Sequence, residues 1–252
     1  MAEPLRRFFV PRGSVRARNV TLGPEMAHRL GRVLRLKRGD RLILAEGGPR
    51  DYEAQITGIT GHAVTAVVVA ERNMPPEPEV TLSLYQSLIR ANRFDLVLEK
   101  GTELGVASFV PVIAARSQQQ GNDETGAARS ERWQRLVTEA AEQCGRGRLP
   151  VVEAPLEFES ALGKARGLKL MPWEGERAQS LAAYLRTLER RPRAVDLFIG
   201  PEGGFEPAEV QLARDEGAIL LGLGPRILRS ETAAIVASAL VLGALGELGD
   251  LG

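Results

Sequence analysis

Beyond residue 80, short apolar runs alternate with longer stretches whose apolar side chains recur at helical spacing. The runs predict strands at 80–86, 107–113, 168–171, 194–199 and 218–221, and the stretches between them predict helices at 92–104, 130–144, 179–189, 207–216 and 231–248. Gly105 follows the first helix and Pro207 opens the fourth, as glycine and proline often do at helix ends. Regular alternation of strands and helices indicates an α/β domain with a mainly parallel sheet.

The first 72 residues have a different pattern, with short strands predicted at 41–45, 52–59 and 63–70 and separated by glycine turns. This spacing favours a small β-barrel, interrupted by one helix at 24–36. Three prolines between residues 73 and 79 exclude a helix there and indicate an extended linker. The sequence therefore predicts a domain at 1–72, a linker at 73–79 and a domain at 80–252.

The composition is that of an ordinary globular protein, with 252 residues, 44% hydrophobic and 26% charged. The single cysteine, Cys144, cannot form an internal disulfide, so we expect a cytoplasmic protein. Two histidines and one cysteine are too few for a typical zinc site, and no metal is expected. The longest apolar stretch is too short to cross a bilayer, and the N-terminus lacks the apolar segment of a signal peptide.

The charge is unevenly distributed, although the net charge of the chain is only +1. Residues 1–72 contain 13 Lys and Arg against 7 Asp and Glu, whereas the rest of the chain is mildly acidic. A basic domain beside an acidic one suggests that the first domain contacts a polyanion. A solvated basic face with no partner remains the alternative.

Two glycine-rich turns directly follow predicted buried strands, at 199–205 and at 221–232. Ligands of open α/β sheets bind at the carboxyl ends of the strands, so the two turns are candidates for one pocket. The acidic residues Glu202, Glu206 and Glu209 would repel a phosphate there, and the glycine spacing differs from that of dinucleotide-binding proteins. A neutral or cationic ligand, such as a nucleoside with a positive sulfonium, fits better. Plain strand–helix turns are the alternative.

Other features admit two interpretations each. Glu99 and Glu103 share one helix face, and such carboxylates either do acid–base chemistry or pair with cations. Arg226 and Arg229 could bind an RNA phosphate or stack on a base. Alternatively, they could form salt bridges to Glu231 or Glu202. The last predicted helix is apolar on nearly all sides, which indicates burial in the core or in a two-fold dimer interface.

Four ordered motifs resemble one known family, over about residues 6–250. They are EKGTELGV, EAAEQCGR, IGPEGGF and LGPRILRSETAAI, preceded by RRFFV and HRLGRVLRLKRGD. This combination is similar to the RsmE family of S-adenosylmethionine (SAM)-dependent methyltransferases, which modify N3 of uridine 1498 in 16S ribosomal RNA of the small subunit. The resemblance implies an RNA methyltransferase that acts on this uridine.

The resemblance also implies a fold and a cofactor site. The C-terminal domain would be of the SPOUT type, with a deep trefoil knot at about 194–235, and the N-terminal domain would be a PUA-like RNA-binding barrel. The working unit would be a homodimer. SAM would be held in the knot by Met171, Pro172, Gly200, Pro201, Glu202, Gly203, Leu221, Gly222, Leu223, Pro225, Arg226, Ile227, Leu228 and Thr232.

Methylation of uracil N3 requires removal of its proton and alignment with the methyl carbon. Arg226 or Arg229 is the candidate for stabilising negative charge on a uracil oxygen, and Glu231 is the candidate proton acceptor. The candidate contacts to RNA are Arg6, Arg7, Arg12, Arg29, Arg32 and Arg35. A non-catalytic ribosome-assembly factor and a SPOUT enzyme acting on another RNA site remain alternatives. The missing dinucleotide motif weighs against an oxidoreductase.

Overall fold

The computed structural model describes residues 5–118 and 126–249, and the chain divides into two compact units. The first unit comprises residues 1–77 and 141–149, and the second comprises residues 78–140 and 150–252. The return of residues 141–149 to the first unit is not signalled by any local sequence pattern. It arises from ion pairs between residues far apart in the chain, such as Arg29 with Glu142 and Arg146 with Glu77.

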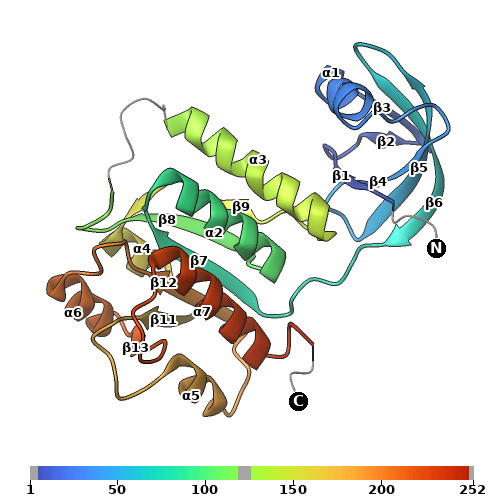
Figure 1. The fold of residues 1–252 in the computed structure, drawn as a ribbon. Helices are drawn as coiled ribbons and strands as arrows, with labels where there is room; N and C mark the ends of the chain where they lie inside the picture. The colour runs from blue at the N-terminus through green and yellow to red at the C-terminus, as the bar shows by residue number, and fades with distance from the viewer. Residues whose placement is uncertain (1–4, 119–125, 250–252) are drawn as a thin grey trace. The chain divides into compact units, whose positions relative to one another are not determined.

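The first unit is built on a six-stranded sheet with the order β1-β4-β5-β6-β3-β2 (Figure 1). Its strands are β1 (Arg7–Phe9), β2 (Val15–Arg16), β3 (Asn19–Leu22), β4 (Arg41–Ala45), β5 (Arg50–Ile59) and β6 (Val64–Asn73). β1 pairs with β4 in parallel, and the other neighbours are antiparallel. In the described part of the chain no ladder joins β1 to β2, so the closed barrel expected from the sequence is not confirmed.

The helix expected at 24–36 forms only in part. A single α-turn, α1 (Pro24–Ala27), continues as a π-helix, η1 (His28–Val33), in which the N–H of Leu34 donates to the carbonyl of Arg29. The predicted helix is therefore present over residues 24–33, but most of it is a π-helix and it ends at Val33 rather than at Leu36. Arg35 follows in the left-handed region with φ +55°, a conformation that costs energy for a residue with a Cβ atom. The segment is thus a specialised turn carrying several arginines.

The second unit contains a seven-stranded parallel sheet, which confirms the predicted α/β class. The order is β10-β8-β7-β12-β11-β13, and β9 also pairs with β8. The strands are β7 (Thr81–Ser87), β8 (Ser108–Ile113), β9 (Val151–Val152), β10 (Leu156–Glu157), β11 (Leu168–Pro172), β12 (Ala194–Ile199) and β13 (Ile219–Leu221). All pairings are parallel. The strands β9 and β10 have two residues each, which is too short for the apolar pattern from which a strand is predicted.

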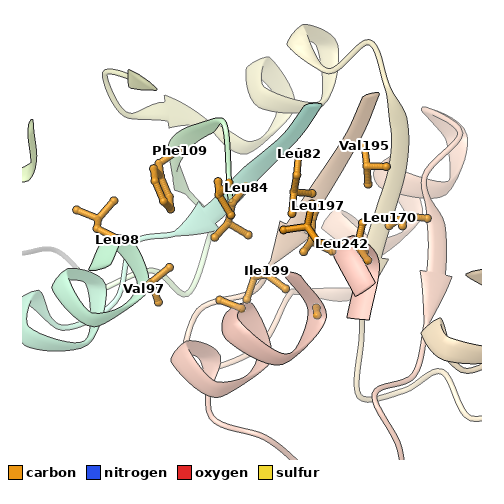
Figure 2. Packing of buried hydrophobic residues seen from close by; sticks show 14 of the residues in the cluster. Leu82, Leu84, Val97, Leu98, Phe109, Leu170, Val195, Leu197, Ile199 and Leu242 are labelled. Carbon is orange, nitrogen blue, oxygen red and sulfur yellow. The ribbon is translucent and has the colours of Figure 1, made fainter. Parts of the chain in front are cut away.

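Helices cover both faces of this sheet (Figure 1). One core lies under α2 (Ala91–Leu104), α3 (Gly126–Cys144), α5 (Leu181–Arg186) and α7 (Ser230–Ala244), and the other under α4 (Phe158–Lys164) and α6 (Pro207–Asp215). In the first core, Leu82, Leu84 and Leu197 of the central strands belong to the same buried cluster as Leu242 of α7 (Figure 2). No helix in the described part of the chain is long and apolar enough to span a membrane.

Helix α7 is less completely buried than its sequence suggests. It packs against α2 and α5 through a face that includes the fully buried Ala234, Ala237 and Val241. Ile235 and Leu240, on the rest of its surface, are only half-buried. An apolar surface of this kind remains available for contact with another molecule.

Candidate functional site

The carboxyl ends of four neighbouring parallel strands meet at one edge of the second sheet. In register, Pro172 at the end of β11 lies beside Leu221 at the end of β13, and Ile199 at the end of β12 lies beside Gln86 of β7. The three segments predicted to hold the cofactor therefore leave the sheet at the same edge. This edge is where open α/β sheets bind their ligands.

The segment after β11 is hydrogen-bonded to the segment after β13. The N–H of Trp173 donates to the carbonyl of Leu221 over 2.9 Å, and the N–H of Leu181 donates to the carbonyl of Gly222 over 2.9 Å. The N–H of Gly222 donates in turn to the carbonyl of Gln179 over 2.8 Å. These backbone bonds fix the two segments side by side.

Glycine is required where these segments touch. A Cβ atom at Gly222 would lie 2.6 Å from the carbonyl oxygen of Glu176, closer than real side chains approach backbone. Gly204, after β12, has φ +70°, and a Cβ there would lie 2.5 Å from the carboxylate of Glu174. The loops after β11 and β13 are thus packed at backbone distance, and the loop after β12 meets the side chain of Glu174.

The predicted cofactor residues differ in exposure. Met171 is fully buried in the core under α4 and α6, so its side chain is not presented at the loop surface. Pro172, Pro201, Leu221 and Gly222 are also buried. By contrast, the turn from Gly224 to Ile227 is exposed, and the side chain of Ile227 is 88% exposed. The remaining predicted residues are exposed or half-buried, namely Gly200, Glu202, Gly203, Leu223, Leu228 and Thr232.

The predicted catalytic arginines are not the partners of the nearby carboxylates. Arg93 of α2 forms those pairs instead, with its Nη1 3.3 Å from Glu202 Oε1 and its Nε 3.6 Å from Glu231 Oε1. Arg226 and Arg229 are both exposed, and neither forms a salt bridge in the described part of the chain. Arg229 is the residue before the first turn of α7. Their guanidinium groups therefore lie at the surface of the glycine-rich turn.

Glu231 sits in the first turn of α7 and is only 8% exposed. Its Oε1 faces Arg93, whereas its Oε2 has no hydrogen-bond partner in the described part of the chain. A buried carboxylate oxygen without a partner is costly, and it is placed to accept a proton or a hydrogen bond from a ligand.

Three residues at this edge were missed by the sequence analysis, namely Gln86, Arg93 and Ser230. Gln86 is completely buried at the end of β7, and its Nε2 donates to Ser230 Oγ over 2.9 Å. Ser230 Oγ donates in turn to the carbonyl of Gly200 over 2.5 Å. The signal that would have identified Gln86 is its place at the carboxyl end of the predicted strand 80–86, where open α/β sheets bind their ligands.

The other acidic candidates have structural partners. Glu99 and Glu103 both accept hydrogen bonds from Lys100 Nζ, at 2.7 and 2.9 Å, and both are exposed. Glu209 accepts from the N–H of Glu206 over 2.8 Å in a capping box at the start of α6. These carboxylates stabilise helix surfaces and ends. No group of three His, Cys, Asp or Glu suited to a metal ion occurs in the described ranges.

The predicted RNA-contact arginines of the first unit fall into two groups. Arg7 is 7% exposed and forms an ion pair with Asp51, so its guanidinium is not presented to a polyanion. Arg29 pairs with Glu142 through both guanidinium Nη atoms and lies over the ring of Phe8. The other four are exposed, namely Arg6, Arg12, Arg32 and Arg35.

The chain was compared with known proteins. A family model described as an RNA methyltransferase domain matches residues 76–242. Ribosomal RNA small subunit methyltransferase E of Synechocystis sp. is 38% identical over 224 residues, which cover 87% of this chain and 71% of that protein. The Bacillus subtilis protein of the same name is 29% identical, covering 84% of this chain and 85% of its own length.

Solved structures agree with this result. Ribosomal RNA small subunit methyltransferase E of Neisseria gonorrhoeae, bound to SAM, superposes with a TM-score of 0.85 at 30% identity, covering 95% of this chain and 97% of that one. A Legionella pneumophila protein in complex with SAM gives a TM-score of 0.88 at 30% identity, covering 96% and 98% of the two chains. The chain belongs to the ribosomal RNA small subunit methyltransferase E family.

Proposed function

We propose that the protein is a SAM-dependent methyltransferase that methylates N3 of uridine 1498 in 16S ribosomal RNA of the small subunit. Membership of the family supports the activity, the cofactor and the ribosomal substrate. The observation that carries the proposal is the meeting of the two glycine-rich turns and the segment after β11 at the carboxyl edge of β11, β12 and β13. The position of the uridine and the N3 atom rest on the sequence resemblance.

The cofactor site is proposed at this edge. Backbone groups of residues 171–172, 200–203 and 221–228 would hold SAM, with Thr232 adjoining them, because a Cβ atom at Gly222 has no room where the loops touch. The carboxylates of Glu202 and Glu231 lie close to Arg93 at the same edge and suit a ligand that carries a positive charge. When bound, SAM supplies a methyl group on a positively charged sulfur, which makes the methyl carbon electrophilic.

The chain's own residues would orient the uridine and handle its proton. Arg226 and Arg229 would stabilise the negative charge that develops on a uracil oxygen as N3 loses its proton. Glu231 Oε2, which has no partner in the described part of the chain, would accept that proton directly or through water. Arg93 would hold the Glu231 carboxylate in position through Oε1. Positioning of N3 against the methyl carbon would supply much of the rate.

The first unit would act as a PUA-like RNA-binding module. Its exposed arginines Arg6, Arg12, Arg32 and Arg35 would contact phosphates of the ribosomal RNA. Arg7 and Arg29 would instead stabilise the unit, because each is held by a carboxylate. The basic excess of residues 1–72 supports this division of roles.

We also propose that residues 194–235 form the deep trefoil knot of SPOUT enzymes and that the protein works as a cytoplasmic homodimer. The backbone bonds that join residues 173–181 to residues 221–222 are compatible with the knot. The half-buried apolar side chains of α7 and the exposed Ile227 support a partner surface. A second copy of the chain would cover the apolar side chains of α7 and the side chain of Ile227.

The experiment is mass spectrometry of nucleosides from ribosomal RNA of a strain that lacks the gene. The proposal predicts loss of 3-methyluridine from 16S ribosomal RNA and its return on complementation. Unchanged 3-methyluridine would reject this activity. Loss of a different methylated nucleoside would assign the enzyme to another RNA site. Full methylation with an assembly defect would favour the non-catalytic assembly factor.

A further inference from the structure

The hydroxyl of Ser230 connects three separate strand ends. Ser230 begins α7 and follows the glycine-rich turn after β13. Its Oγ lies 2.5 Å from the carbonyl oxygen of Gly200, the first residue after β12, and 2.9 Å from Nε2 of Gln86 at the end of β7. This one side chain therefore bridges the two glycine-rich turns at the proposed cofactor edge.

The direction of each hydrogen bond is fixed by its partners. Gln86 Nε2 also lies 2.9 Å from the backbone carbonyl oxygen of Ser87, which can only accept, so the amide group must present its nitrogen on this side. Gln86 therefore donates to Ser230 Oγ, and the Ser230 hydroxyl proton is left to point at the Gly200 carbonyl. Both hydrogen bonds of Ser230 Oγ, which form a relay from Gln86 to Gly200, are therefore satisfied, whereas Gln86 Oε1 has no hydrogen-bond partner in the described part of the chain.

The relay is buried, which makes it strong and specific. Gln86 is 0% exposed and Ser230 is 7% exposed. Hydrogen bonds that share one hydroxyl in a dry environment strengthen each other. The geometry of the two turns is therefore more sensitive to this hydroxyl than to an exposed contact such as that between Arg93 and Glu202.

We propose that Ser230 is a positioning residue that fixes the spacing of the two glycine-rich turns for SAM binding, with Gln86 orienting its hydroxyl. The inference rests on the proposed cofactor site and adds to it a residue that need not touch the cofactor. Without the hydroxyl, the Gly200 carbonyl loses its partner, and the turn at 200–204 can move relative to the turn at 221–229. Part of the free energy of SAM binding would then be used to order both turns, so the Kd for SAM would rise.

The matched control lies on the same helix. Ser238 is 0% exposed, and its Oγ has no hydrogen-bond partner in the described part of the chain. Ser238→Ala therefore removes the same atom from α7 and leaves both turns intact. Ser230→Thr keeps the hydroxyl and is the conservative rescue variant.

The test is isothermal titration of SAM into the full-length wild type, S230A, S230T and S238A, at a temperature where circular dichroism shows all of them folded. We expect S230A to raise the Kd for SAM about fivefold, which is the typical worth of one such hydrogen bond. S238A should bind as the wild type does, and S230T should recover most of the affinity. In methylation assays S230A should raise KM for SAM more than it lowers kcat.

Each outcome is decisive. Wild-type affinity in S230A would overturn the inference while the cofactor site stands. An equal rise of the Kd for SAM in S238A would also overturn the inference, because the effect would then be common to buried serines of α7. If S230T fails to fold, the comparison of the Kd values for SAM of S230A and S238A still tests the inference. Failure of the wild type to bind SAM would instead reject the proposed cofactor site itself.

Discussion

The backbone N–H of Trp173 donates to the carbonyl oxygen of Leu221 over 2.9 Å, although the two residues belong to different strand–loop connections. This bond joins the segment after β11 to the segment after β13. Gly200, after the neighbouring strand β12, accepts a hydrogen bond from Ser230 at the start of α7, so hydrogen bonds hold all three predicted cofactor loops at this edge. The predictions below test this edge and the surface that is proposed to contact RNA.

Substitution of Gly222 by alanine should weaken cofactor binding. The new Cβ would lie 2.6 Å from the carbonyl oxygen of Glu176, and backbone cannot yield as a flexible side chain does. We expect the Kd for SAM to rise at least about tenfold, equivalent to about 1.4 kcal/mol. Gly163→Ala in α4 is the control, because a Cβ there meets nothing within 4 Å. Equal affinities of the two variants in calorimetry would show that the close approach is unimportant.

Substitution of Arg229 by alanine should reduce turnover and spare cofactor affinity. The guanidinium is exposed beside the glycine-rich turn, where it can stabilise charge on the uracil. Loss of one such group typically lowers kcat about 100-fold or more. Arg186→Ala, an exposed arginine of α5, is the control. If calorimetry shows that SAM binding collapses in R229A, the arginine belongs to the cofactor site and the assigned role is wrong.

The double substitution R32A/R35A should weaken RNA binding in a salt-dependent manner. Both side chains are exposed at and just beyond the π-helix η1. Each lost phosphate contact reduces the slope of log K against log salt by about 0.7 on single-stranded RNA. The control is Arg50→Ala, whose guanidinium pairs with Glu71 on the surface. A slope that stays at the wild-type value in filter-binding assays would exclude the two arginines from the RNA surface.

Tyr85 should make the protein sensitive to alkali. Burial, together with Asp196 and Glu153, raises the pKa of Tyr85 from 10.0 to about 12. As the pH rises above 10, the unfolded chain releases this proton and the folded chain retains it, so stability falls. Between pH 9 and pH 11 the free energy of unfolding of the wild type should fall by about 1.4 kcal/mol relative to that of Tyr85→Phe. The phenylalanine can still stack on Phe198.

Urea denaturation of both proteins at several pH values is the measurement for Tyr85. If the free energies of unfolding of the wild type and of Tyr85→Phe change in parallel up to pH 11, the raised pKa of Tyr85 is contradicted.

The parallel α/β unit could be predicted from the sequence because its longer strands are rich in apolar residues and alternate with helical stretches. Val195, Leu197 and Ile199 all reach the core with 2% exposure or less. Gly105 has φ +111° and ends α2, as its position suggested. Such elements are encoded by residues that are neighbours in sequence.

Elements that depend on distant partners could not be predicted in this way. The spacing of Leu30 and Val33 indicates an α-helix, yet Leu30 is buried in the π-helix while Val33 is 62% exposed. Arg7 looks like an RNA contact in a basic segment, but Asp51 on another strand holds it in the interior. Charge patterns alone do not distinguish an arginine that binds a carboxylate from one that is free for a ligand.

The candidate site shows the same limit. The glycine-rich turns were visible in the sequence, and the structure brings them to one edge. Gln86, Arg93 and Ser230 were missed because their roles depend on contacts between strand ends and helix starts that are far apart in sequence. The proposed knot would depend on the path of the whole chain, so no local pattern could encode it.

The central claim is that this edge delivers a methyl group from SAM to N3 of one uridine. The most direct test is incubation of the purified protein with unmethylated small ribosomal subunits and deuterated-methyl SAM, followed by mass spectrometry of fragments of the 16S ribosomal RNA. The account predicts labelled 3-methyluridine at position 1498 with the wild type, and less label with G222A at a SAM concentration near the wild-type Kd. Label on any other nucleoside, or no label with a wild type that binds SAM, would contradict it.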